Sequence, residues 1–303
     1  MNKKEYVKGL ISGSMAYITW GLLPLYWKLV DVLGADQIFA QRIVWSFLFL
    51  TIILFSRGQF RNLVSVFSSR EKTINGLLCM IFISINWFTY IWAVNNGFVI
   101  EASLGYFINP LVSTALGAIV FKEKLSKIQG IGFIIASAGV IYLAINYSHI
   151  PVISLLLAFS FALYGVFKKK SKLDSIVGLS FETLILGVPA LFYIVFSEIS
   201  GNGFTGNVSS IYWLIISLSG IATSIPLLLY AESVKRLPLG IIGFMQYMSP
   251  TISLILGIFV FKEVFDSTMM VAFGMIWLAL IFYSIDQFRV LNTKKDESLL
   301  FDL

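Results

Sequence analysis

The feature that most constrains this chain is an internal repeat. Two short motifs, a pair ending in proline and a Phe-Lys-Glu triplet, each occur twice with the same separation along the sequence: Asn109-Pro110 and Ser249-Pro250, then Phe121-Lys122-Glu123 and Phe261-Lys262-Glu263. We call this separation, from Pro110 to Pro250, the repeat offset. Self-similarity at a fixed period indicates two copies of one structural unit. In an apolar chain, such duplication is typical of transport proteins whose binding site lies between the copies.

The composition places both copies in a membrane. Hydrophobic residues make up 58% of the 303 positions and charged residues only 13%, which is far from the balance of a soluble domain. Windows of about twenty apolar residues predict an all-α integral membrane protein with ten transmembrane helices. We place them near residues 8–29, 37–56, 73–94, 101–121, 127–147, 151–168, 175–197, 210–232, 239–260 and 267–287.

The basic residues test this count and orient the chain. If both termini are cytoplasmic, all 22 Lys and Arg residues except Lys28, Arg42 and Lys262 lie in cytoplasmic segments, as the positive-inside rule requires. Five spans per copy is an odd number, so the second copy enters from the opposite side. We therefore predict two inverted five-helix repeats, at residues 1–148 and 149–288, and a cytoplasmic tail at 289–303.

The twin prolines mark a polar face in the fourth and ninth spans. A proline inside a helix frees the carbonyl four residues earlier, here the carbonyls of Tyr106 and Gln246. Further polar residues follow on the same helix faces: Asn109 and Ser113 in the first copy, Ser249 and Ser253 in the second. These two stripes either line a central cavity between the copies or hold neighbouring helices together.

In the third span, Asn86 and Tyr90 are one helical turn apart and face the same side. We expect them to line that cavity, with interfacial anchoring as the alternative for the aromatic residues of this span.

Two charges inside the spans, Arg42 and Glu182, occupy equivalent positions in the two copies. Each lies about 10 Å into its helix, from opposite sides of the membrane. A charge in the membrane interior needs a partner, water or a route to the surface. We expect Lys28, Arg42 and Glu101 to form an outer cluster and Glu182 to pair with Lys168 or Lys235, both clusters acting in gating. Glu182 is also the candidate for proton coupling.

Several function classes lack their usual residues. The chain has no Gly-rich phosphate loop, no G-x-S-x-G motif and no carboxylate dyad, so we predict neither an enzyme nor a cofactor. One Cys and one His exclude a Cys/His metal site. The net charge of +6 reflects membrane orientation rather than nucleic-acid binding. Small residues on single helix faces, at Gly9 and Gly13 and at Gly132, Ala136 and Gly139, allow close helix approach or a homodimer contact.

Several segments resemble the RarD-type, or chloramphenicol-sensitivity, branch of the EamA (drug/metabolite transporter) superfamily. They are residues 16–21 (AYITWG), 41–46 (QRIVWS), 86–124, 158–170 (AFSFALYGVFKKK), 181–183 (FET) and 243–250 (GFMQYMSP). The resemblance covers nearly the whole chain. It implies ten helices in two inverted repeats, a central cavity that opens alternately to either side, and export of small metabolites from a bacterial cell.

We therefore predict a multi-pass inner-membrane secondary transporter that exports amino-acid-like or amphipathic compounds. The expected substrate-binding residues are Asn86, Tyr90, Tyr106, Asn109, Tyr164, Gln246 and Tyr247. Lys28, Arg42, Glu101 and Glu182 are expected to act in gating or coupling, and Pro110 and Pro250 as hinges. The alternatives are a membrane scaffold or receptor that transports nothing, disfavoured by the short loops, and an intramembrane enzyme.

Overall fold

The predicted spans all form helices in the computed structural model. It describes residues 3–30, 34–96, 98–146, 152–205, 207–261 and 267–300, and within these ranges the chain forms helices and turns without a strand. The first half contains α1 (Lys3–Trp27), η1 (Lys28–Val30), α2 (Ala35–Ser56), α3 (Phe60–Phe67), α4 (Arg70–Asn95), α5 (Val99–Phe121) and α6 (Lys127–Ile145). The second half contains α7 (Val152–Lys170), α8 (Ser175–Ile199), α9 (Ser210–Ser217), α10 (Ser219–Arg236), α11 (Leu239–Gln246), α12 (Met248–Leu256), η2 (Gly257–Phe261) and α13 (Ser267–Leu300).

Nine helical segments of the described residues are long and apolar enough to cross a membrane, if α9–α10 and α11–η2 each count as one segment. Helix α1 has 25 residues and packs in the same bundle, but its polar and aromatic residues lower its mean hydropathy. Together they make ten long segments, which is consistent with the predicted count.

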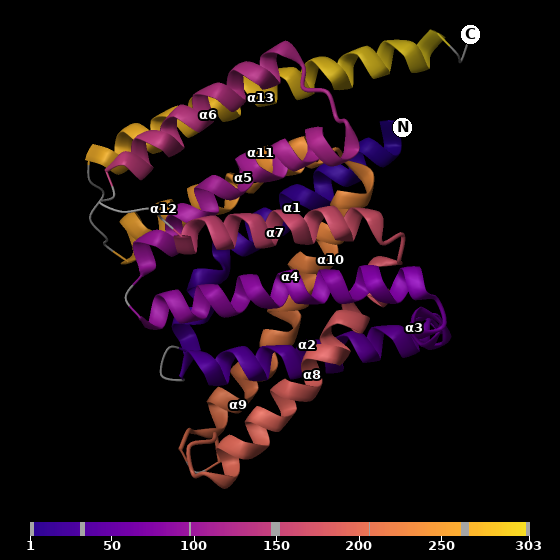
Figure 1. Ribbon diagram of the computed structural model, residues 1–303, viewed down its shortest axis with the longest axis vertical. Helices are drawn as coiled ribbons and strands as arrows, with labels where there is room; N and C mark the ends of the chain where they lie inside the picture. The colour runs from indigo at the N-terminus through magenta and orange to yellow at the C-terminus, as the bar shows by residue number, and fades with distance from the viewer. Residues whose placement is uncertain are drawn as a thin grey trace.

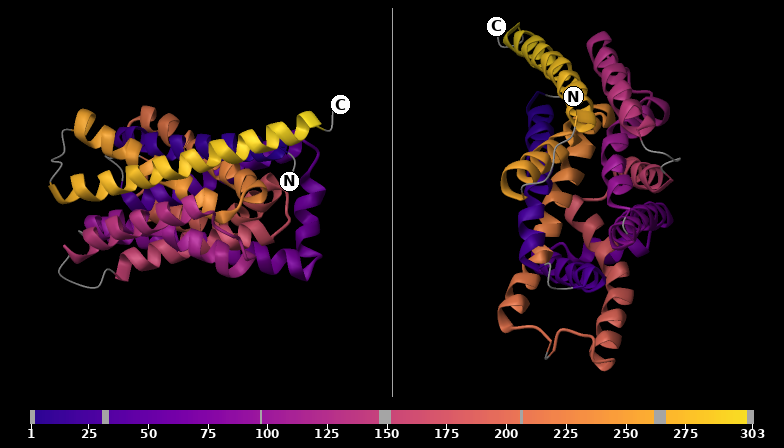
Figure 2. Two further views of the ribbon diagram at one scale, coloured as in Figure 1. Left: turned by 90° about the horizontal axis from the view of Figure 1, so that it is seen from above. Right: turned by 90° about the vertical axis from the view of Figure 1, so that its left-hand side faces the viewer.

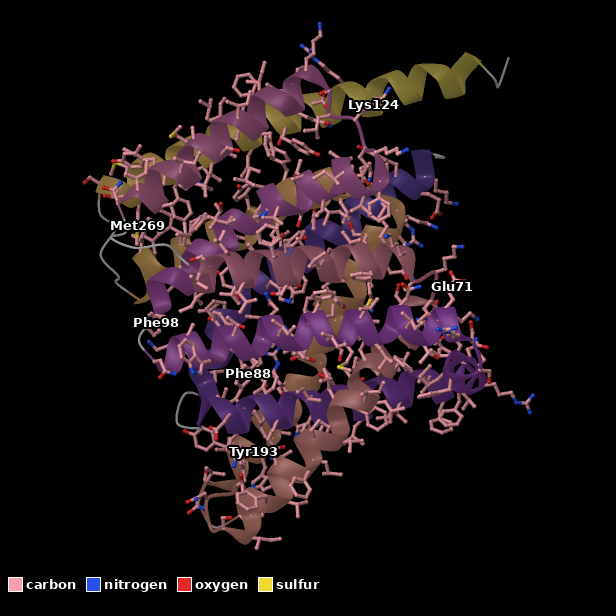
Figure 3. The ribbon with its side chains drawn as sticks, in the orientation of Figure 1. Glu71, Phe88, Phe98, Lys124, Tyr193 and Met269 are labelled. Atoms are coloured by element: carbon pink, nitrogen blue, oxygen red, sulfur yellow. The ribbon has the colours of Figure 1, made fainter. Side chains whose placement is uncertain are left out.

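Helices α4, α5, α6, α7 and α13 run from one side of the bundle to the other in Figure 1, while α8 and α10 are inclined to them, so the bundle has two ends. Glu71 and Lys124 lie at one end, and Phe98 and Met269 lie at the other (Figure 3). The start of α1 and the end of α13 lie at the same end as Lys124 (Figure 1). We call this end, which also carries the ends of α7 and α10 with Lys168–Lys170, Lys235 and Arg236, the basic end.

The helices form two rows that each mix both halves of the chain (Figure 2). One row runs α6, α5, α7, α4, α8. The other runs α12, α1, α10, α2, and α13 joins it through a contact with α1. The rows meet through α6 with α13, α5 with α11, and α2 with α8. A shift by the repeat offset exchanges the rows helix for helix, so the packing follows the internal repeat.

One hydrogen bond marks the centre of this symmetry. The Tyr247 hydroxyl donates to the carbonyl of Phe107 at 3.1 Å, and the two residues are 140 positions apart, which is the repeat offset itself. Because they occupy equivalent positions in the two copies, the bond lies where the copies cross.

The two proline helices differ. Helix α5 continues through Pro110, whereas the equivalent segment is interrupted at Tyr247 and resumes as α12, which contains Pro250 and passes into the π-helical turn η2. Pro250 lacks the N–H that would bond the Gln246 carbonyl, so the ladder is weakest there. The predicted hinge at Pro250 thus coincides with a break in the helix, and that at Pro110 does not.

Other features differ from the sequence-based prediction. A short helix, α3, precedes α4; it buries Leu63 and Val66 and exposes Phe60, Val64 and Phe67. Its apolar residues at helical spacing were the signal for it. Helix α13 continues through the predicted tail to Leu300, because no Gly or Pro follows Gly274 to end it.

The small-residue faces are used for packing within the chain. A Cβ added at Gly13 would meet Ser233 and Met245, and one added at Gly139 would meet Met275 and the carbonyl of Ala272. Close approach of α1 to α10 and α11, and of α6 to α13, therefore occupies both faces.

Candidate functional site

An ion pair is buried near the basic end between α7 and α8. Lys168 Nζ lies 2.5 Å from Glu182 Oε1, and both side chains are almost fully buried. The Tyr164 hydroxyl donates to the other carboxylate oxygen at 3.3 Å. Of the two partners expected for Glu182, Lys168 is the one in contact, whereas Lys235 donates to the Ser175 hydroxyl at 2.9 Å.

A second ion pair ties α5, α7 and α11 together at the same end. Lys122 ends α5 in a left-handed conformation (φ 55°), which lets Glu123 turn back toward the bundle. Glu123 accepts from Lys169 Nζ at 2.6 Å and from the Gly240 amide at the start of α11 at 3.2 Å. A carboxylate at a helix N-terminus is stabilised by the helix dipole. This pair was not predicted from the sequence, although the acidic residue after Lys122 and the basic run Lys168–Lys170 were its signal.

Five aromatic rings fill the space between the two rows in the basic half. Tyr17 and Trp20 of α1 and Tyr230 of α10 pack against Phe161 and Tyr164 of α7, with centroid separations from 5.3 to 6.3 Å. We call these five residues the aromatic plug. The three tyrosines are at most 2% exposed, so the plug and the two ion pairs leave this half tightly packed.

The opposite half is more open. Tyr90 of α4 and Tyr106 of α5 are 38% and 41% exposed. Their rings form an edge-to-face pair at 5.7 Å. The strongly exposed apolar residues of α4 are Ile74, Ile81, Ile85, Phe88 and Trp92. At 100° per residue these five share one face, and Tyr90 points to the other side of the helix. Its exposed surface therefore faces the interior of the bundle rather than lipid.

Arg42 of α2 lies beside this tyrosine pair. Its guanidinium carbon is 4.3 Å from the Trp87 ring centre, 5.6 Å from that of Trp27 and 5.9 Å from that of Phe39. Arg42 is also within electrostatic reach of Tyr90 and Tyr106. No acidic side chain among the described residues forms an ion pair with it, and its buried Nε has no hydrogen-bond partner there.

Aromatic contact offsets only part of the cost of this charge. Each cation–π contact contributes about 0.5–2 kcal/mol, depending on how dry it is, whereas a lone arginine at a helix centre costs about 2.5–3.5 kcal/mol on insertion scales. Arg42 lies about 10 Å along α2 from its start, at the end of the bundle opposite the basic end. The site is polar, positive and lined by flat rings.

The polar stripes near the prolines contact neighbouring helices in the same row. Asn109 donates to the Ala158 carbonyl of α7 at 2.9 Å, and Asn86 donates to the next carbonyl along α7, that of Leu157, at 2.9 Å. Ser253 donates to the Gly21 carbonyl of α1 at 3.2 Å. In this conformation the stripes thus hold helices together, the second of the two interpretations from sequence.

The remaining predicted site residues lie either in the interior of the bundle or at the end opposite the basic end. Tyr164, Gln246 and Tyr247 are buried in the packed half or at the crossing of the copies. Lys28 lies in η1 at the end opposite Lys168. Glu101 lies in the first turn of α5 at that same end, and its side chain lies outside the part of the chain that the structure describes.

Two hollows of about 300 and 390 Å³ lie at the opposite end, between the start of α2 and the α8–α9 connection. Gly34, Gln37 and Asn202 line both of them. Gln37 is five residues, about 7.5 Å, before Arg42 along α2. Among the described residues no group of His, Cys, Asp and Glu side chains has the arrangement of a metal site.

The profile of the EamA-like transporter family matches the chain twice, at residues 7–145 and 150–285. The chain belongs to this family. It is 47% identical to the uncharacterized transporter YojE of Bacillus subtilis (strain 168), over 95% of this chain and 97% of that protein. It is 35% identical to Protein RarD of Escherichia coli (strain K12), over 94% of this chain and 97% of the relative.

A solved crystal structure shares the fold at 18% sequence identity, with a TM-score of 0.68 over 92% of this chain and 98% of the other. The expected family is confirmed. The protein is a multi-pass membrane transporter of a bacterial family, embedded in a lipid bilayer and handling a small-molecule substrate.

Proposed function

We propose that this protein is a secondary transporter that exports small metabolites by alternating access between two inverted five-helix repeats. In this proposal the basic end is cytoplasmic, in a bacterial inner membrane. The substrate binds between the two rows, where Tyr90 and Tyr106 supply contacts. Asn86, Asn109, Tyr164, Gln246 and Tyr247 join the site as the inner half opens.

One observation carries the proposal: equivalent residues of the two repeats lie in opposite environments. Tyr90 is 38% exposed, whereas its counterpart Tyr230 is 2% exposed within the aromatic plug. Tyr106 is 41% exposed, whereas its counterpart Gln246 is 7% exposed. If the repeats exchange conformations, the plug opens and the Tyr90 side closes. An inverted repeat makes those two states similar in energy because each reuses the other's contacts.

The charged groups then act in gating. The Lys168–Glu182 and Lys169–Glu123 pairs stabilise the closed basic end, and their separation accompanies opening. Lys28 and Arg42 occupy the outer positions that correspond to Lys168 and Glu182, and Glu101 acts with them at that end. The helix break before Pro250 provides a hinge. Glu182 could also carry a proton when Lys168 moves away.

Thiol accessibility tests alternating access. Cys79, the single cysteine of the chain, is buried and can be replaced by Ser. In this background, Tyr90→Cys should react with an impermeant maleimide from the extracellular side, and Tyr230→Cys should not react. Adding Lys168→Met should increase labelling of Tyr230→Cys from the cytoplasmic side and reduce labelling of Tyr90→Cys. Labelling of both positions from one side contradicts the proposal.

Reconstituted vesicles test transport itself. Vesicles loaded with a mixture of small metabolites should lose particular solutes faster than protein-free vesicles, and a pH gradient should change the rate if Glu182 carries a proton. Lys170→Met, on an exposed position of α7, is the matched control and should remain active. If no solute moves, the scaffold or receptor alternative is favoured instead.

A further inference from the structure

Equivalent positions at the two ends of the bundle carry different combinations of charge. At the basic end Glu182 is paired with Lys168 at 2.5 Å. A shift by the repeat offset maps this pair onto Arg42 and Lys28, two cations. The inverted repeat therefore places like charges at the opposite end, in positions that hold an ion pair at the basic end.

Arg42 has no anionic partner among the described residues. Its guanidinium contacts the rings of Trp27, Phe39 and Trp87, and none of these can neutralise it. Nε is buried without a hydrogen-bond partner among the described residues. A planar guanidinium with donors to spare binds a carboxylate through two parallel hydrogen bonds.

The aromatic groups around Arg42 place a second requirement on a ligand, which concerns its shape. Tyr90 and Tyr106 turn exposed ring surface toward the interior, and neither hydroxyl forms a hydrogen bond with the described residues. Trp87 adds a flat apolar face beside them. A ligand with a planar apolar body would pack on these rings while its charged end reaches Arg42.

We propose that Arg42 is the anion-binding residue of the substrate site, and that the site takes small monocarboxylates with a flat apolar body. This inference rests on the proposed function, since it assigns a substrate class to the same chamber. It assigns Arg42 to ligand recognition rather than to a permanent ion pair within the protein.

Binding to the purified full-length protein tests this without requiring transport. The probes are 3-phenylpropionate and its neutral amide, which differ in charge and little in shape, measured by calorimetry in detergent. The wild type should bind the carboxylate at least 10-fold more tightly than the amide. Arg42→Gln should abolish this preference, and Arg42→Lys, which keeps the charge without the planar fork, should retain part of it. Arg61→Gln, on the exposed surface of α3, should leave the preference unchanged.

The variants also separate this inference from its alternatives. A preference that survives in Arg42→Gln, or the absence of carboxylate binding by the wild type, overturns it. If Glu101 neutralises Arg42 in the wild type, the wild type should show no preference for the carboxylate and Glu101→Gln should gain one. That result would also overturn the inference. If Arg42→Gln does not fold, a partial loss in Arg42→Lys still supports the inference, and an unchanged preference refutes it. Carboxylate binding without solute efflux from vesicles would refute the proposed transport and leave the anion site standing.

Discussion

Replacing Lys168 with Met should destabilise the protein more than replacing its partner Glu182 with Gln. Both residues are almost fully buried and contact each other at 2.5 Å, so either change leaves one charge without its partner. The two residues differ in how they can respond. Glu182 lies about 10 Å into α8 on a short side chain, whereas Lys168 is two residues from the end of α7 on a long, flexible one.

The magnitude follows from these contacts. Removing one partner of a buried ion pair costs about 3–5 kcal/mol. In Lys168→Met, Tyr164 still donates to Glu182 at 3.3 Å, so we expect the lower limit, about 3 kcal/mol. In Glu182→Gln, the ammonium group of Lys168 can reach the nearby surface, so we expect about 1–2 kcal/mol. The double variant loses both charges and should return to within about 1 kcal/mol of the wild type.

The free energy of unfolding can be measured by SDS titration in mixed micelles with tryptophan fluorescence as the signal. Lys170→Met, on an exposed position of the same helix, is the control and should change stability by no more than about 0.5 kcal/mol. If Lys168→Met matches this control, or if the effects of Lys168→Met and Glu182→Gln simply add, the pair is not a coupled buried contact and the reasoning is wrong.

Three further predictions concern helix contacts. Gly220→Ala should destabilise by about 1–3 kcal/mol, because its Cβ would lie 2.4 Å from the Trp45 carbonyl; Gly130→Ala, with open space around it, should be neutral or slightly stabilising in the same SDS titration. Pro250→Ala should lower the efflux rate in vesicles without loss of stability, because it lets the helix run straight through the break; an equal effect of Pro110→Ala would argue against a hinge at the break. Tyr247→Phe should cost about 1 kcal/mol of unfolding free energy through the lost bond to Phe107; no change would show that this bond adds nothing to the contact between the copies.

The fold could be predicted almost completely from sequence. Lipid requires each span to satisfy its own backbone groups, so a run of about twenty apolar residues already specifies a helix. The short helix α3 and the interruptions in α9–α10 and α11–α12 were missed, because they depend on local packing and on the missing proline N–H rather than on hydropathy. The contact of Glu182 with Lys168, one of its two expected partners, was foreseen, and the binding role of Tyr90 and Tyr106 stays a prediction.

Hydropathy, the repeat offset and the distribution of Lys and Arg depend only on the order of residues along the chain. They were enough to predict the spans, the inverted repeat and the basic end. The rotation of each helix about its own axis is different, because it depends on which neighbours it packs against. Only the folded bundle could show that Asn86 and Asn109 bond α7, that Tyr230 is closed where Tyr90 is open, and that Arg42 lies among aromatic rings.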